Sequence, residues 1–353
     1  MRQAGNGAKR ALLFAVILRP ERGRKENHQM KRMIACLLCV LLLTGCAAPA
    51  DHTADGGKLS VVCTLFPYYD FARQIAGDRA EIVLLLSPGR EAHSFEPTPR
   101  DALTIANADV FLCNGGEGEL WVEEMLRAAG ENIGVIARMM DHVDAHEEEI
   151  VEGMQLRGHD HDHGEAHHDH GEDSDEVEYD EHIWTSPANA ILLCRAVCEA
   201  LCEADGENAE EYRANCQSYC AELSALDGQF RALRSEAKRD LLVFADRFPF
   251  LYFCEEYDLR YRAAFHGCST DTEPSLATLK YLIDKVAEER IPVVYTVDLS
   301  SQKIAEAVAE STGAGIGRLY SMQTVSRADF EAGETYVSLM ERNLEALRKG
   351  LLG

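Results

Sequence analysis

Residues 87–101, SPGREAHSFEPTPRD, follow an apolar run and carry a single histidine, His93, near their centre. The apolar run, residues 83–86 (VLLL), is typical of a buried strand, and the Pro-Gly pair after it predicts a turn. We therefore expect His93 at the carboxyl end of a strand. That edge is where open α/β sheets bind their ligands.

A second histidine has a similar setting. His182 stands within residues 179–187 (YDEHIWTSP), in a loop that ends at an expected helix start. Between the two loops lies a tract of histidine, aspartate and glutamate, residues 158–173 (GHDHDHGEAHHDHGED). Its six histidines are His159, His161, His163, His167, His168 and His170. Two loop histidines that flank such a tract predict metal binding rather than nucleophilic catalysis.

These motifs resemble those of the zinc- and manganese-class solute-binding lipoproteins of metal ABC transporters. The resemblance covers the chain from Lys58 onward and rests on several motifs that recur in order. Besides the tract, they are residues 92–101 (AHSFEPTPRD), 108–126 (ADVFLCNGGEGELWVEEML), 181–187 (EHIWTSP) and 244–250 (FADRFPF). The resemblance implies an α/β fold of two lobes, each with a mostly parallel sheet flanked by helices. A long rigid linker helix would join the lobes, and one metal ion would be held in the cleft.

The composition fits this class. A chain of 353 residues is long enough for about two domains, and 46% hydrophobic with 27% charged residues is typical of a globular protein. Sixty acidic residues against 35 basic ones give a net charge of -25, which argues against nucleic acid as a partner. The same charge is compatible with binding a cation, although acidity alone usually serves solubility.

The N-terminal region predicts export and a lipid anchor. Two basic residues after Met30 precede an apolar run, residues 34–43 (IACLLCVLLL), and the tetrapeptide LTGC ends at Cys46. This pattern resembles a bacterial lipobox, which implies a signal peptide over residues 30–45, cleavage before Cys46 and a lipid on its sulfur. An uncleaved anchor is the alternative, but the apolar run is shorter than a spanning helix needs. Residues 46–57 would form a flexible tether.

The segment before this signal is basic and holds one short apolar run, residues 11–18 (ALLFAVIL). We interpret residues 1–29 as an extension that is not native, or was wrongly assigned, and expect Met30 or Met33 to be the true start.

The cysteines do not predict a disulfide framework. Three of the twelve belong to the signal, which leaves nine, an odd number. Five of the nine recur every fourth residue, at Cys194, Cys198 and Cys202 and at Cys216 and Cys220. This is the spacing of one helix face, and we interpret these cysteines as small buried hydrophobes. A thiolate metal site is the alternative, although the mature chain has no CxxC pair.

Strands and helices alternate in both halves of the chain, which predicts mostly parallel sheets. In the first half we expect strands at 58–66, 81–87, 108–115 and 132–139, and helices at 68–77, 99–107 and 121–129. In the second half we expect strands at 241–246, 261–265, 291–299 and 317–321, and helices at 250–257, 275–290, 302–311 and 336–347.

Between the halves, two further helices are expected over residues 188–204 and 208–238, and the second carries one long apolar stripe. The resemblance makes this second helix the linker. Residues 141–180 contain few large apolar side chains and predict a mobile loop. We therefore divide the mature chain into an N-terminal lobe with this loop, connecting helices and a C-terminal lobe, at residues 58–186, 187–239 and 240–353.

The resemblance implies that His93 and His182 ligate the metal. At the third position most relatives have histidine for zinc or glutamate for manganese, whereas Ala245 stands there in this chain. Asp246 is the nearest carboxylate, and it could ligate or pair with Arg247 instead.

Two further candidates end strands of the second half. The family places a carboxylate at the position of Asp298, which could otherwise cap the following helix. His266 could replace the missing imidazole, or it could be an ordinary polar loop residue. A set rich in imidazole favours Zn²⁺, and Mn²⁺ is the second choice.

The expected function is capture of zinc outside the cytoplasm and its delivery to a membrane ABC permease. The protein would be a monomer, anchored through acylated Cys46 at the outer face of the bacterial cytoplasmic membrane. The His-rich tract would collect zinc near the cleft. The alternatives are a manganese-specific binding protein, a metal buffer based on the tract, and an adhesion lipoprotein. A zinc hydrolase is disfavoured because the sequence has neither HExxH nor GxSxG.

Overall fold

The computed structural model describes residues 57–90, 95–129, 133–154, 178–269 and 273–353. The predicted signal peptide, the tether and Cys46 lie outside the described residues. Within the described part of the chain, no helix is both long and apolar enough to cross a bilayer.

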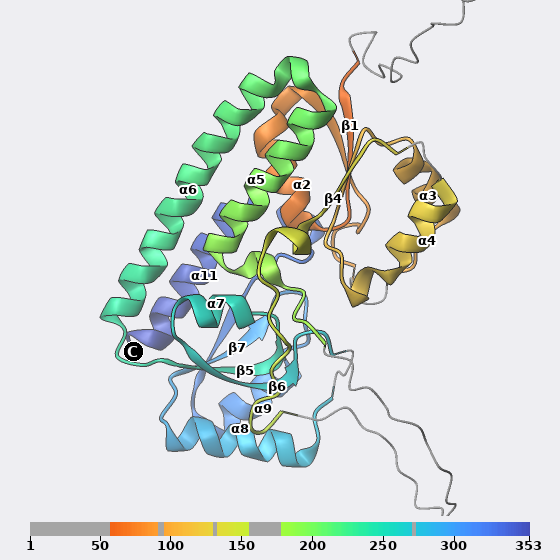
Figure 1. Ribbon diagram of the computed structural model, residues 1–353. Helices are drawn as coiled ribbons and strands as arrows, with labels where there is room; N and C mark the ends of the chain where they lie inside the picture. Colours follow the sequence, from red (N-terminus) through yellow and green to blue (C-terminus); the bar gives the residue numbers. More distant parts are fainter. Residues whose placement is uncertain (1–56, 91–94, 130–132, 155–177, 270–272) are drawn as a thin grey trace, which may run out of the picture. The chain divides into compact units, whose positions relative to one another are not determined.

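The first sheet is parallel and contains four strands in the order β2-β1-β3-β4 (Figure 1). The strands are β1 (Leu59–Cys63), β2 (Ala80–Leu84), β3 (Val110–Cys113) and β4 (Val135–Arg138). Three helices alternate with them, α2 (Phe66–Ala76), α3 (Pro99–Ala106) and α4 (Leu120–Ala129). The start of α3 is fixed by a capping box between Thr98 and Asp101, with Pro99 at the first helical position.

The second sheet repeats this topology, with the order β6-β5-β7-β8 and all strands parallel. Its strands are β5 (Leu241–Phe248), β6 (Arg260–His266), β7 (Val293–Val297) and β8 (Gly315–Leu319). The helices that alternate with them are α7 (Leu251–Glu256), α8 (Leu276–Glu288) and α9 (Lys303–Thr312). Two parallel lobes with the same strand order confirm the predicted fold class.

The connection between the sheets is a helical hairpin of α5 (Pro187–Ala204) and α6 (Ala209–Glu236). With 28 residues, α6 is about 42 Å long at 1.5 Å per residue. It packs against α5 and α2 on the side of the first sheet and against the C-terminal helix α11 (Tyr336–Leu351) (Figure 1). The apolar stripe predicted on α6 is buried, which confirms a long helix that contacts both lobes.

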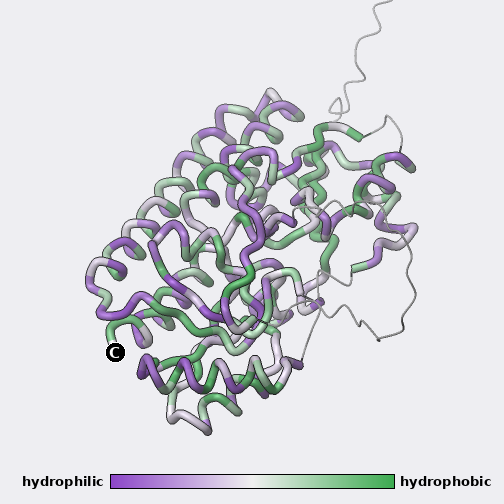
Figure 2. Tube along the Cα trace, turned by 60° about the horizontal axis from the view of Figure 1, so that its bottom comes forward, coloured by the Kyte–Doolittle hydropathy of each residue, from purple (hydrophilic) through white to green (hydrophobic). Residues whose placement is uncertain are grey.

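One buried aspartate joins three of these helices. Asp70 on α2 accepts hydrogen bonds from the Tyr219 hydroxyl on α6 and from the Tyr336 backbone N–H at the start of α11, each at 2.8 Å. Arg73 and Gln74 also donate to this carboxylate. In Figure 2 the helices alternate between hydrophilic and hydrophobic residues along their length, as expected for helices with one buried face.

The largest departure from the sequence-based expectation concerns residues 141–180. Residues 141–154 do not form part of a mobile loop but pack along the second lobe. Glu149 accepts a hydrogen bond from the Tyr261 hydroxyl at 2.7 Å, and Met154 is buried in the core. Glu147 pairs with Tyr179 in an isolated antiparallel bridge. The composition of this segment predicted a mobile loop because acidic side chains are usually solvated. In the structure, several of its carboxylates bind hydroxyl and imidazole groups of the second lobe.

Smaller differences lie at the ends of elements. A short helix, α10 (Arg327–Glu331), was not predicted, and its start is capped by the Ser326 side chain. β5 continues two residues beyond its predicted end, and α11 continues to Leu351. The His-rich tract lies outside the described residues.

Candidate metal centre

A polar cavity of about 220 Å³ lies where the strands of the second sheet end and where the loop after β2 begins. This position matches the ligand-binding edge of open α/β sheets. Its polar and charged lining includes Arg90, His182, Arg247, Asp298, Ser321 and Thr324. Of the five residues predicted for the cleft site, the cavity brings His182 and Asp298 together.

His182 is held in one orientation by its neighbours. It precedes the 3-10 helix Ile183–Thr185, which leads into α5, and it is only 1% exposed. Its backbone N–H and its ring Nδ1 both contact Asp180 Oδ1, at 2.7 and 3.0 Å. We assign the Nδ1 proton to this contact, which leaves Nε2 as the nitrogen that can bind a metal. A carboxylate in this position orients a ligating imidazole and raises its basicity.

The charge state of His182 follows from the same contacts. Burial lowers the pKa of the imidazole, but the carboxylate of Asp180 outweighs it, with smaller contributions from Glu181 and Glu148. The net effect is a pKa above the ordinary value of 6.5. Glu181, the other acidic neighbour, is buried, and its Oε1 accepts the Gly118 N–H at 2.7 Å. Asp180 therefore orients the ring, while Glu181 binds the first lobe.

Asp298 follows β7 and is 9% exposed. Its Oδ1 accepts the Ser321 backbone N–H at 2.8 Å, which ties the ends of β7 and β8 together. Burial raises the pKa of the carboxyl to about 6. The alternative helix-capping role does not apply, because the N-cap of α9 is Gln302.

Asp246 and Ala245 stand at the third position of the family pattern. The Asp246 carboxylate accepts the backbone N–H groups of Val297 and Arg247, at 2.9 and 2.8 Å, and so links β5 to β7. The Ala245 side chain packs in the hydrophobic core beneath the sheet. The pairing of β5 with β6 is irregular between Phe244 and Arg247, and the residue of β5 that lines the cavity is Arg247.

His266 lies beside the cavity but is turned toward the segment before the tract. Its Nδ1 contacts Glu148 Oε2 at 2.9 Å, and both side chains are buried. The next residue, Gly267, lines the cavity, and a Cβ atom there would lie 3.1 Å from the His182 ring. His266 therefore supports the wall of the site, while Gly267 gives the His182 ring its space.

Two arginines in the cavity wall were not predicted as site residues. Arg90 precedes the segment that carries His93, and the Arg247 guanidinium donates to the Ser269 carbonyl oxygen at 3.4 Å. The sequence signal for Arg247 was its place in the FADRFPF motif. The sequence indicated Arg247 only as a partner of Asp246, because the irregular strand pairing is not visible in it.

His93 lies outside the described residues, so its role stays a prediction. Earlier in the same loop, Gly89 and Arg90 line the cavity. The Gly89 N–H donates to the Val325 carbonyl oxygen at 2.7 Å, which fixes the start of this loop against the second lobe.

Two lobes of parallel α/β structure with a small polar cavity at their strand ends define a two-lobed solute-binding protein. The family described as "Zinc-uptake complex component A periplasmic" matches residues 61–350, and the chain belongs to this family. It is a family of solute-binding transport proteins and not of enzymes. This result confirms the resemblance seen in the sequence motifs.

Individual relatives agree with this placement. The zinc-binding lipoprotein AdcA of Streptococcus pneumoniae serotype 4 is 31% identical over 318 residues, which cover 90% of this chain and 60% of AdcA. The high-affinity zinc uptake system protein ZnuA of Bacillus subtilis is 30% identical, over 90% of this chain and 95% of ZnuA. The chain thus spans about three fifths of AdcA but nearly all of ZnuA.

Among solved structures, the Zn(II)-bound ZnuA-like domain of S. pneumoniae AdcA matches with a TM-score of 0.68 and 28% identity. The match covers 84% of this chain and all of that domain.

Proposed function

We propose that this protein captures Zn²⁺ outside the cytoplasm and delivers it to the ABC permease of a zinc-uptake system. The observation that carries the proposal is the pairing of His182, oriented by Asp180, with Asp298 in one buried cavity at the strand ends. Relatives named for zinc binding and zinc uptake support the choice of metal. As in the sequence-based expectation, acylated Cys46 would anchor the protein beside the permease.

The proposed ligands are His182 through Nε2, Asp298 and His93. Two imidazoles and one carboxylate suit Zn²⁺ better than Mn²⁺, which prefers sites built of oxygen ligands. His266 and Asp246 already bind Glu148 and backbone amides, and we leave them out of this ligand set. The His-rich tract would act as a separate, weaker zinc reservoir, because its composition predicts a loss of chain entropy on binding.

The zinc site can be tested apart from the tract by deleting residues 158–173. We expect one zinc ion per chain to stay tightly bound in this variant, and Mn²⁺ to compete weakly. Metal analysis after dialysis and competition titration with a chromophoric chelator would measure both. The full-length protein serves as the control and should bind additional, weaker zinc. A deletion variant without tight zinc would contradict the cleft site and would favour a metal buffer based on the tract or a manganese-binding protein.

Zinc affinity should fall as the pH is lowered from about 7.5 to 5.5. Ligation requires neutral His182 and ionised Asp298, and the pKa values of both groups are raised, that of Asp298 to about 6. Protons therefore compete at higher pH than they would at unperturbed groups. Each ligand should cost about tenfold in affinity per pH unit below its pKa. Competition titration across this range would measure the slope, and an affinity that does not change with pH would contradict the proposed ligands.

A further inference from the structure

The hairpin of α5 and α6 carries a cluster of thiols that the cleft site does not use. All nine cysteines in the described part of the chain are free, and five of them face one another across this hairpin. We call Cys194, Cys198, Cys202, Cys216 and Cys220 the hairpin thiols. Their spacing of four residues on each helix places them on the facing sides of the two helices.

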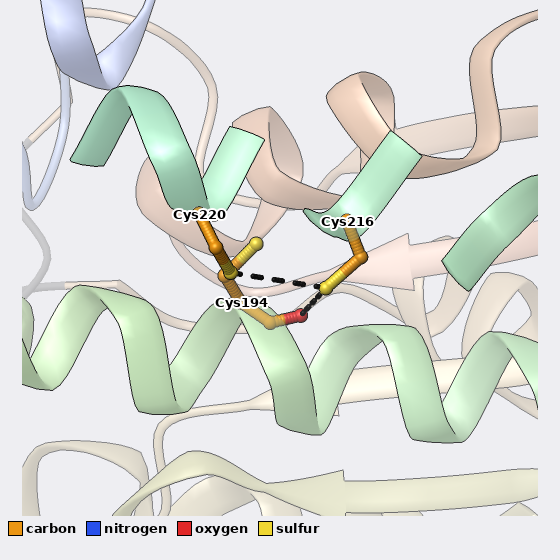
Figure 3. A group of neighbouring side chains, drawn as sticks. All are labelled: Cys194, Cys216 and Cys220. Carbon is orange, nitrogen blue, oxygen red and sulfur yellow. Dashed lines mark hydrogen bonds between the residues drawn. The ribbon is translucent and has the colours of Figure 1, made fainter. Parts of the chain in front are cut away.

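Three of the hairpin thiols come close enough to share one ion. The sulfur atoms of Cys194, Cys216 and Cys220 all lie within 4.8 Å of one another (Figure 3). The Cys216 and Cys220 sulfurs are 3.9 Å apart. A tetrahedral ion with metal–sulfur bonds of about 2.3 Å needs sulfurs about 3.8 Å apart. Side-chain rotations that move the sulfur atoms by less than about 1 Å would therefore bring them to the spacing of a tetrahedral metal site.

The Cys198 thiol lies near the three thiols, and the cluster is accessible from solvent. The Cys198 thiol interacts with that of Cys216 across the hairpin, and its sulfur lies 4.0 Å from that of Cys202 on α5. Cys198, Cys202, Cys216 and Cys220 line an open groove of about 720 Å³ between the helices. Cys194 is fully buried next to Cys216 and Cys220, which line the groove, and Cys220 is 8% exposed. An ion could enter through the groove and meet the deepest thiol last.

The charges around the groove suit a metal–thiolate centre. The ligating thiols would lose their protons on metal binding and become thiolates. Arg195 and Arg213 line the groove together with Glu199 and Glu203, and the two guanidinium groups would offset part of the negative charge of three or four thiolates.

Ordinary packing explains the other buried cysteines better than these five. Cys63 and Cys254 are buried within the hydrophobic core, and Cys194, Cys198, Cys216 and Cys220 belong to the same core. The hairpin thiols differ in two respects, because their sulfurs contact one another within each helix and four of them line an open groove. An apolar helix seam does not require either feature.

We propose that Cys194, Cys216 and Cys220, with Cys198 as a fourth ligand, form a second metal site in this protein, for a thiophilic ion such as Zn²⁺, Cd²⁺ or Cu⁺. Binding exchanges protons for the metal: each thiol that ligates releases one proton, and no electrons are transferred. The site is independent of the cleft, because its ligands lie on α5 and α6 and not at strand ends.

Titration of the reduced, metal-free, full-length protein with Cd²⁺ under anaerobic conditions tests this site. Thiolate-to-cadmium charge-transfer absorption in the ultraviolet reports sulfur ligation only, so histidine and carboxylate sites do not contribute. We expect the band to saturate at one ion per chain and to disappear in the triple variant Cys194→Ala, Cys216→Ala, Cys220→Ala. The single variant Cys220→Ala, which alters the most exposed of the three thiols, should bind at least about tenfold more weakly.

Two control variants separate this site from other sources of signal. Cys254→Ala removes a lone buried thiol and should leave the band unchanged. His182→Ala disables the proposed cleft ligand and should also leave it unchanged, so that failure of the cleft proposal and failure of this one are distinguishable. Absence of the band in the reduced parent protein, its persistence in the triple variant, or an unchanged affinity in Cys220→Ala would overturn the proposal. Alkylation of the thiols gives a second readout. We expect bound Cd²⁺ to block alkylation only in the parent protein and in the two controls.

Discussion

His182→Ala is expected to lower zinc affinity by more than about 100-fold. The substitution removes the one imidazole that lines the described cavity, and no neighbouring lining residue offers another ring nitrogen among the residues that the structure describes. Loss of an outer partner of a ligand typically costs 10–100-fold, so loss of the ligand itself should cost more. Competition titration of the variant that lacks residues 158–173 would measure the effect without interference from the tract.

Two further substitutions should give an intermediate effect and no effect on zinc affinity. Asp180→Asn keeps an oxygen near the His182 ring but removes the negative charge, and it should weaken zinc binding by about 10–100-fold. His142→Ala is the matched control, because His142 is exposed at the end of the 3-10 helix Met139–His142 and should not affect affinity. If His182→Ala bound zinc as tightly as His142→Ala, the cavity would not be the capture site.

The sequence predicted His182 through the resemblance of its EHIWTSP motif, and Asp298 through the resemblance and its place after the apolar run of β7. Parallel sheets bring strand ends to one edge, where such a residue can meet a ligand. The third position depends on a local feature of the structure. The irregular pairing of β5 and β6 turns Asp246 toward β7 and gives the cavity Arg247. Such a shift of register depends on tertiary packing and leaves no mark in the pattern of apolar residues.

The role of His266 could not be predicted for a different reason. Its partner, Glu148, belongs to a segment whose composition predicted a mobile loop. Acidic residues are usually solvated, and only the position of the second lobe shows that Glu148 and Glu149 have buried or half-buried partners there. The α6 stripe shows the opposite case, since its helical period alone predicted the buried face. The period did not reveal that the thiols of α5 and α6 meet.

Asp70→Ala is expected to lower the free energy of unfolding by about 3–5 kcal/mol, the usual cost of breaking a buried charged network by removing one partner. Asp70 is fully buried, and its carboxylate accepts from Arg73, Gln74, Tyr219 and Tyr336. Without it, the Tyr336 N–H and the Tyr219 hydroxyl stay buried and lose their acceptor. Chemical denaturation of the metal-free protein would measure the change.

Asp284→Ala is the matched control for this substitution, because Asp284 is exposed on α8 and pairs with Lys280 across one helical turn. An exposed pair of this kind contributes less than about 1 kcal/mol. Asp70 joins α2, which packs on the first sheet, to α6 and α11, so its loss should weaken the contact between the lobes rather than the metal ligands. Zinc affinity at low temperature should therefore stay within a few fold of the parent protein. If Asp70→Ala and Asp284→Ala unfolded alike, the carboxylate would not hold these helices together, and apolar packing along α6 would be the main connection between the lobes.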